Sequence, residues 1–224
     1  MLNVRYKEDA EIEIGVDEAG RGCLWGPMYA GAVIWPPEDD WLEEHREISP
    51  LICDSKKVSE KKRLALANAI ENLAISYGVG AVHAQEIDLL GMTAANRLAF
   101  VRAIEGANVQ PDRVLLDGTL HLTDEECDAL HANQYITVVD GDATYLPIAA
   151  ASILAKVHRD TWVKTYVEQH PQLEEQYSLL SNKGYGAEKH RQGILKHGVH
   201  EEHRRLFLRK LLGTSKCLIE DEED

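Results

Sequence analysis

Cysteine, aromatic residues and long apolar runs are all scarce in this chain of 224 residues. Its four cysteines, at positions 23, 53, 127 and 217, form no CxxC pair and no disulfide framework of the kind that small secreted domains use. No segment approaches the ~18 consecutive apolar residues of a membrane-spanning helix. The N-terminus also lacks the basic-then-apolar order of a signal peptide. We therefore expect a soluble, cytoplasmic protein with reduced thiols and no membrane partner.

Positive charge is scarce as well, since 24 Lys and Arg face 38 Asp and Glu, for a net charge of -14. This balance excludes a uniformly basic surface for nucleic acid, but the charges are unevenly distributed. Residues 183–210 carry eight Lys or Arg against three acids, and "SKKVSEKKR" at 55–63 carries five against one. If the 183–210 segment contacts phosphate, Arg204 and Arg205 are the positions to test. Solvated helix faces are the alternative for both clusters.

Hydrophobic periodicity predicts strands that alternate with helices, followed by helices alone. The expected strands are 11–16, 28–35, 75–84, 113–118 and 134–142. Helices are expected over 59–73, from 90 to about 106, from the Thr123 capping box onward, and in three or four pieces after Pro147. This order predicts an α/β fold with a mixed central sheet flanked by helices.

The domain organisation follows from the same pattern. We expect a catalytic core over residues 1–161 and a small helical C-terminal module over 162–213 that contributes to substrate binding. The last residues, 214–224, end in "EDEED" and are expected to form a disordered acidic tail.

Acidic residues follow three of the predicted strands. They are Asp17 and Glu18 in "IGVDE", Asp117 in "VLLDG", and Asp140 and Asp142 in "TVVDGD". Ligands of open α/β sheets bind beyond the carboxyl ends of the strands, where these acids could converge. Converging carboxylates need a cation, and an all-oxygen ligand set favours Mg²⁺ or Mn²⁺. Two such ions are suited to phosphodiester cleavage. The alternative is that each aspartate simply begins a turn.

Two glycines flank Arg21 directly after the first acidic pair. Gly20 and Gly22 allow close backbone approach to a ligand, and their amides are suited to cradling a phosphate or a sugar hydroxyl. Taken alone, GRG is a weak motif.

The chain resembles ribonuclease HII, the type 2 ribonuclease H family, from about residue 12 to residue 212. The motifs that carry the resemblance are "GVDEAGRGCLWGPMYAGAVI", "DSKKVSEKKR", "VLLDG", "GDATYLPIAAASILAKVHRD", "NKGYGAEKH" and "HEEHRRLF". The resemblance implies a ribonuclease H-like fold and cleavage of the RNA strand of RNA/DNA hybrids. It also implies incision 5′ to single ribonucleotides embedded in duplex DNA, which gives 5′-phosphate and 3′-hydroxyl ends.

The resemblance also implies a catalytic site of four carboxylates that holds two Mg²⁺ or Mn²⁺ ions. These carboxylates fall on Asp17, Glu18, Asp117 and Asp142. Asp142 is chosen over Asp140 because the family's aspartate lies ten residues before the serine of "AAASILAKV". Asp140 stands where the family commonly has a lysine, and this departure puts a fifth acid near the site.

Substrate-binding residues are implied in the same way. Gly20, Arg21 and Gly22 match the loop that reads the ribose 2′-hydroxyl, the group that distinguishes RNA from DNA. Tyr185 matches the tyrosine that packs on the next deoxynucleotide and senses the RNA-to-DNA junction. Gly186 replaces the proline that usually follows it.

Lys56, Ser152 and Lys156 are expected to bind phosphate or to support the site. Ser152, Lys156 and Asp160 share one helix face, so a Lys156–Asp160 ion pair is expected. The histidines at 158, 190 and 203 share no metal-like spacing, and capping or surface roles are favoured.

Other functions stay open. A different two-metal, structure-selective nuclease would share the acids without needing GRG or the turn at Tyr185. A catalytically inactive nucleic-acid-binding module would keep the fold and the basic C-terminal helices, although acids at all four matched positions argue against it. The related type HIII branch has an N-terminal substrate-binding extension, which is not seen ahead of "EIEIGV". We expect a monomer, and the sequence identifies no protein partner.

Overall fold

The computed structural model describes residues 2–213 except for 54, 56 and 57. Its strands are β1 (Glu13–Ala19), β2 (Met28–Ile34), β3 (Ser76–Val82), β4 (Arg113–Asp117) and β5 (Gln134–Val138). Its helices in the first half are α1 (Glu43–Ile48), α2 (Glu60–Leu73), α3 (Ala84–Leu90), α4 (Met92–Glu105) and α5 (Asp124–Leu130). The second half holds α6 (Leu146–Gln169), α7 (Gln172–Tyr177), α8 (Leu179–Asn182), α9 (Glu188–His197) and α10 (Arg205–Leu208). A 3-10 turn, η4 (Gly141–Ala143), links β5 to α6.

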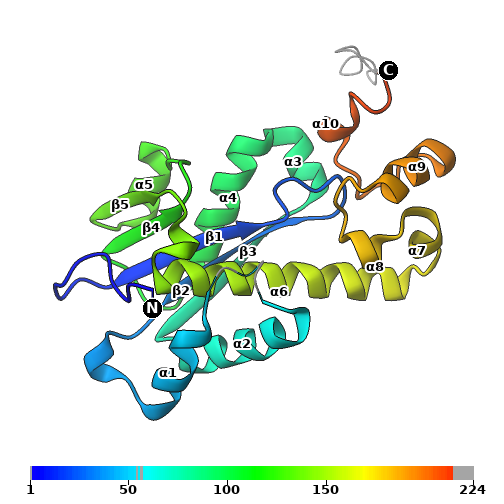
Figure 1. Ribbon diagram of the computed structural model, residues 1–224. Helices are drawn as coiled ribbons and strands as arrows, with labels where there is room; N and C mark the ends of the chain where they lie inside the picture. Colours follow the sequence, from blue (N-terminus) through cyan, green and yellow to red (C-terminus); the bar gives the residue numbers. More distant parts are fainter. Residues whose placement is uncertain (1, 54, 56–57, 214–224) are drawn as a thin grey trace.

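The strands form one mixed sheet in the order β3-β2-β1-β4-β5. β1 pairs antiparallel with β2, which pairs antiparallel with β3, whereas β1–β4 and β4–β5 are parallel. Helices cover both faces of the sheet (Figure 1). The predicted α/β fold with a mixed central sheet is therefore confirmed.

The two faces of β1 carry different cores, as alternation along a strand requires. Ile14 and Val16 pack with α4 in one cluster, whereas α6 and α2 pack together across the other face. Glycines on that second face let α6 approach closely. A Cβ added at Gly15 would lie 2.4 Å from the Ile148 backbone nitrogen, and one at Gly31 would lie 2.3 Å from the Ala151 carbonyl oxygen. The beginning of α6 is thus pressed against β1 and β2.

A separate apolar cluster surrounds the far end of α6. Trp25 packs there with Val163 and Val167 of α6 and with Tyr177 and Ile194 of the following helices. Figure 1 shows α7 to α10 gathered around this end of α6, away from β5. The proposed division between residues 161 and 162 falls within α6, which is continuous there. The division stays a prediction, and the expected acidic tail at 214–224 lies outside the described residues.

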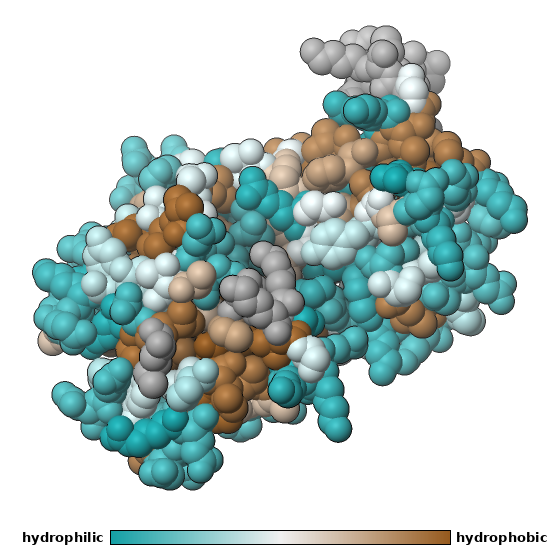
Figure 2. Space-filling view, viewed as in Figure 1, coloured by the Kyte–Doolittle hydropathy of each residue, from teal (hydrophilic) through white to brown (hydrophobic). Residues whose placement is uncertain are grey.

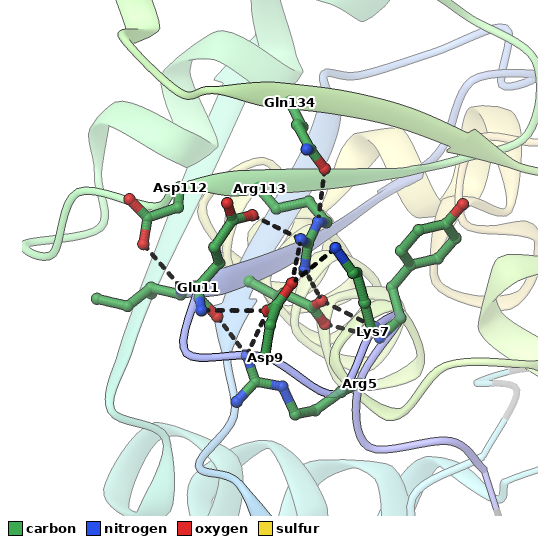
Figure 3. A network of polar contacts seen from close by, with 10 residues as sticks. Arg5, Lys7, Asp9, Glu11, Asp112, Arg113 and Gln134 are labelled. Carbon is green, nitrogen blue, oxygen red and sulfur yellow. Dashed lines mark hydrogen bonds and ion pairs between the residues drawn. The ribbon is translucent and has the colours of Figure 1, made fainter.

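At the opposite end of the sheet, a buried arginine gathers the acids of the N-terminal segment (Figure 3). Arg113 is fully buried at the start of β4 and donates to Asp9 at 2.8 Å, to Glu11 and to Glu13. The pKa of Asp9 falls to about 2, chiefly because of its hydrogen bond with Arg113. This network fixes the N-terminal segment across the starts of β1 and β4.

Two expected elements differ in extent. The helix expected from 90 to about 106 begins at Met92 as α4, and the helix α3, which was not expected, precedes it; Gly91 adopts φ +77° and separates the two. β5 ends at Val138 rather than at 142, because Asp140 takes a left-handed conformation (φ 52°) and starts η4.

Among the described residues, no helix is long and apolar enough to cross a membrane. The face shown in Figure 2 is mostly hydrophilic, with apolar residues in smaller patches.

Candidate active site

The parallel pairing of β1 with β4 brings two of the predicted acids to one edge of the sheet. Val16 pairs with Leu116, so the next residues along each strand, Asp17 and Asp117, lie side by side where the pairing of β1 with β4 ends. Alternation places Asp17 on the α6 face of β1 and Glu18 on the α4 face. The first acidic pair therefore extends around both sides of the strand end, and this accounts for two adjacent carboxylates at that point.

Asp17 is the most buried of these acids, with 6% of its surface exposed. Burial, followed by the charges of Asp117 and Glu18, raises the pKa of Asp17 well above its usual range. A hydrogen bond from Ser152 of α6 opposes this shift, as does the Glu18 amide, which donates to Asp17 Oδ1 at 2.7 Å. Three carboxylates thus lie close enough to repel one another, and a cation among them would relieve that repulsion.

Glu18 contacts a residue that the sequence reasoning missed. Burial raises the pKa of Glu18, and hydrogen bonding from Asn96 and the charge of Arg21 oppose the rise. Arg21 Nη1 lies 3.6 Å from Glu18 Oε1. Asn96 is almost fully buried on α4, and its Oδ1 has no hydrogen-bond partner among the described residues. A polar residue among alanines on the apolar face of a predicted helix was the available signal.

Asp117 is joined to the loop that carries the fourth predicted acid. The Gly141 amide donates to Asp117 Oδ1 at 2.8 Å, and Asp142 follows directly in η4. Asp140, the rejected alternative, is exposed and caps that turn. The structure therefore brings Asp17, Glu18 and Asp117 together and places the backbone of Asp142 beside them.

The donor set suits a hard divalent cation. All four predicted ligands are carboxylates, which Mg²⁺ and Mn²⁺ prefer, and the buried Asp17 is destabilised as an anion by its neighbours. Within the described part of the chain, however, no three His, Cys, Asp or Glu side chains are already arranged around a common metal position. The carboxylates are neighbours, and a bound cation would draw them together.

The GRG loop begins where β1 ends. Gly20 has φ +85°, and a Cβ there would lie 2.0 Å from Arg159 Nε, so only glycine fits. A Cβ at Gly22 would have no neighbour within 4 Å, so its α-carbon faces open space. The Arg21 side chain is largely exposed. The loop thus packs against Arg159 at Gly20 and is open to solvent at Gly22.

One candidate phosphate contact is wrong. Arg204 is fully buried, and it donates to the carbonyl oxygens of Gly20 at 2.8 Å, Arg21 at 3.0 Å and Gly26 at 2.9 Å. Arg205, by contrast, is exposed at the start of α10. The sequence cannot tell which of these two arginines is buried, because the burial of Arg204 depends on the backbone carbonyls that the fold brings to it.

Tyr185 lies in a turn that docks against the GRG loop. The residue is 42% exposed, and its ring lies under two cations, with Lys156 Nζ 5.8 Å and Arg159 Cζ 5.7 Å from the ring centroid. Burial raises the pKa of Tyr185 to about 12, and the second cause of this rise is the Cys23 thiol beside the phenol. The phenol is therefore neutral at neutral pH.

The remaining predicted residues lie on or near α6. Lys156 Nζ pairs with Asp160 Oδ1 at 2.6 Å, which confirms the expected ion pair. Ser152 Oγ lies 2.9 Å from Ser55 Oγ, so the serine that faces Asp17 is itself tied to the 55–63 segment. Lys56, the other predicted phosphate ligand, lies outside the described residues.

Two histidines expected at caps or on the surface are buried instead. His190 Nε2 and His203 Nε2 lie 3.0 Å apart, and His190 Nδ1 lies 2.8 Å from the Tyr185 carbonyl oxygen. The His200 amide donates to His203 Nδ1, so a single proton between the rings satisfies the pair. The expectation failed because both rings turn inward, behind the Tyr185 turn.

A mixed sheet with helices on both faces and carboxylates at the ends of adjacent parallel strands defines a ribonuclease H-like fold. Ribonuclease H2 from Pyrococcus horikoshii OT3 shares this fold at a TM-score of 0.70 and 24% identity, over 89% of this chain and 96% of that one. Bst ribonuclease HIII in complex with Mn²⁺ matches with a TM-score of 0.59 and 21% identity, over 92% and 71% of the two chains. At these identities the likeness establishes the fold alone.

Sequence comparison identifies the family. The model of the family "Ribonuclease HII" matches residues 14–210. Ribonuclease HII of Parabacteroides distasonis is 42% identical over 202 residues, 90% of this chain and 92% of that protein. The chain belongs to the ribonuclease HII family of ribonuclease H hydrolases, which confirms the resemblance noted in the sequence.

Proposed function

We propose that this chain is an endoribonuclease that cleaves the RNA strand of RNA/DNA hybrids and incises duplex DNA 5′ to a single embedded ribonucleotide. The observation that carries the proposal is the β1–β4 register. It sets Asp17 beside Asp117 at one sheet edge, with Glu18 on the same strand end and the Asp142 loop bonded to Asp117. The match to the family model supports the substrate class.

Asp17, Glu18, Asp117 and Asp142 would hold two Mg²⁺ or Mn²⁺ ions. Such ions, when bound, activate a water molecule and stabilise the leaving oxygen. Asp17 would gain most from a bound cation, because it is the most buried of these carboxylates and feels the charges of both Asp117 and Glu18. In the reaction, water adds to phosphorus and the bond from phosphorus to the 3′-oxygen breaks. The 5′-phosphate stays on the ribonucleotide, and the 3′-oxygen leaves as a hydroxyl after it takes a proton.

The chain itself binds and orients the substrate. The open front of Gly20–Gly22 admits the ribose 2′-hydroxyl, and the half-exposed Tyr185 ring provides a stacking surface for the next sugar. Lys156 is held by Asp160 beside that ring, where it is placed to meet a phosphate. Ser152 keeps the Asp17 carboxylate oriented. Lys56, from the basic 55–63 segment, is proposed as a further phosphate ligand.

Incision of a labelled DNA duplex that carries one ribonucleotide tests this function. The reactions contain Mg²⁺, Mn²⁺ or EDTA, and an all-DNA duplex and the Asp142→Asn variant serve as controls. We expect metal-dependent cutting 5′ to the ribonucleotide, with no product from either control. A folded protein that cuts neither this duplex nor a long hybrid with either metal would overturn the proposal. Such a protein would be a binding module or a nuclease with another substrate.

We further propose a cytoplasmic, monomeric protein in which residues 162–213 form a substrate-binding module. The free thiols of Cys23, Cys53 and Cys127 suit a reducing compartment. The Tyr185 turn belongs to the proposed module, and this supports its role in binding. Light scattering of the purified chain checks the monomer, because a mass near twice 25.1 kDa would exclude it.

A further inference from the structure

Two arginines are fully buried behind the substrate-reading loops, and neither forms an ion pair with a described carboxylate. Arg204 donates only to backbone carbonyls of the GRG loop and Gly26. Arg159 of α6 donates to the carbonyls of Pro27 at 3.0 Å, Lys183 at 2.8 Å and Trp25 at 3.1 Å. Burying a guanidinium without a counter-ion is costly. Burial lowers the pKa of Arg204 to about 10.

Arg204 determines which way the peptide groups of the GRG loop point. In a trans peptide, the carbonyl oxygen and the amide hydrogen lie on opposite sides. The carbonyls of Gly20 and Arg21 point inward to Arg204, so the amides of the next residues, Arg21 and Gly22, point away from it. Neither of these amides donates a hydrogen bond to any described residue. Two successive free amides form a concave donor site for an oxygen of the substrate.

Arg159 joins the segment that directly follows this loop, Trp25 to Pro27, to the Tyr185 turn. One guanidinium nitrogen holds the Lys183 carbonyl, and another holds the Trp25 carbonyl. The Gly184 carbonyl also accepts from the Leu24 amide at 2.8 Å, and a Cβ at Gly184 would lie 2.5 Å from the Trp25 oxygen. The distance between the two loops is therefore set by Arg159 and by direct backbone contact.

We propose that Arg204 and Arg159 are positioning residues for ribonucleotide recognition. Arg204 turns the Arg21 and Gly22 amides toward the substrate, and Arg159 fixes the spacing between those amides and Tyr185. Their positive charge lies directly behind the amides and favours a nearby phosphate. This inference rests on the proposed function, because it concerns how that activity selects its substrate.

Lysine variants separate the two roles. Arg204→Lys keeps the charge but cannot hold three carbonyls, so kcat/KM should fall on the order of 10- to 100-fold on single-ribonucleotide duplexes and long hybrids alike. Arg159→Lys should lose more on the single-ribonucleotide duplex than on the hybrid, because only that substrate needs the junction spacing. Arg102→Lys is the control, since Arg102 also donates to a carbonyl, that of Ala81, but its ion pair is with Glu86 and it donates to neither loop.

The kcat/KM values are measured at a temperature below the Tm of every variant, so that unfolding does not contribute to any loss of activity. The inference would be overturned if Arg204→Lys and Arg159→Lys had the same kcat/KM as Arg102→Lys. The two arginines would then have structural roles only. Failure of the unaltered enzyme to incise either substrate would refute the proposed function instead, so the two failures are distinguishable.

Hydrogen exchange of the unaltered protein tests the inference without any variant. The Arg21 and Gly22 amides should exchange at nearly unprotected rates in the free protein. They should become protected when a duplex with one ribonucleotide binds in the presence of Ca²⁺ in place of Mg²⁺. Protection in the free protein, or no change on binding, would contradict the outward orientation.

Discussion

Alanine substitutions at the two glycines of the GRG loop should differ sharply in their effect on stability, with a large loss at Gly20 and almost none at Gly22. Gly20→Ala forces a left-handed conformation on alanine, which costs about 1–2 kcal/mol. Its Cβ would also lie 2.0 Å from Arg159 Nε, so Arg159 must move and lose at least one hydrogen bond. A hydrogen bond to a charged group contributes about 1.5–3 kcal/mol. The free energy of unfolding should therefore fall by about 3 kcal/mol.

Gly22→Ala is the matched control. Nothing lies within 4 Å of its Cβ, and its φ is not positive, so stability should change by less than about 0.5 kcal/mol. Incision should nevertheless fall, because the new methyl group projects into the space that the proposed substrate enters.

Urea unfolding and incision of a single-ribonucleotide duplex measure both effects. A loss of about 3 kcal/mol corresponds to a fall of about 6–12 °C in Tm for a chain of this size. If Gly20→Ala and Gly22→Ala were equally stable, the packing of Arg159 against Gly20 would be refuted. If Gly22→Ala cut as well as the unaltered enzyme, the open front of the loop would not be the substrate side.

Three further predictions concern stability. Arg113→Met should lower the free energy of unfolding by about 3 kcal/mol, because it leaves the buried Glu13 carboxylate without the arginine that balances its charge. An unchanged urea midpoint would contradict this. Burial holds the pKa of His203 at about 3, against 6.5 ordinarily, so the unfolded chain binds its proton first and stability should fall as pH drops from 6.5 toward 3. His203→Gln should flatten that fall by up to about 1.4 kcal/mol per pH unit, and identical slopes would exclude the effect. Finally, Mg²⁺ or Mn²⁺ should raise the Tm of the unaltered protein. Asp117→Asn should raise the Tm measured without metal and reduce the rise in Tm on adding metal, because it removes a charge that repels Asp17. Calorimetry with and without EDTA checks both.

The sheet could be predicted from the sequence because its strands carry their own signals. The alternation of polar and apolar residues in 11–16 indicates a strand buried on one face. The nearly continuous apolar run "RVLL" of β4 indicates a strand buried on both faces. The acids at the strand ends were found for the same reason, since each directly follows such a run. Asp142 could not be chosen over Asp140 by periodicity, and that choice depended on the family resemblance.

The supports of the site could not be predicted from local pattern. Arg204 and Arg205 have the same neighbours in sequence, yet one is buried against Gly20 and the other is exposed. Asn96 touches Glu18 only because α4 crosses the far face of β1. Such contacts join residues roughly 80 to 180 positions apart, and neither propensity nor spacing encodes them.

Because α6 lies so close to the sheet, a small change at the contact would change the orientation of the whole helix. Its 24 residues span about 36 Å, and its first turns are seated against Gly15 and Gly31, where no side chain can intervene. A methyl group added at either glycine would wedge the helix away at one end. A tilt of a few degrees there would move the opposite end by roughly an ångström or more. Arg159 lies partway along α6, so a methyl group at either glycine would displace Arg159 as well, by less than it displaces that end.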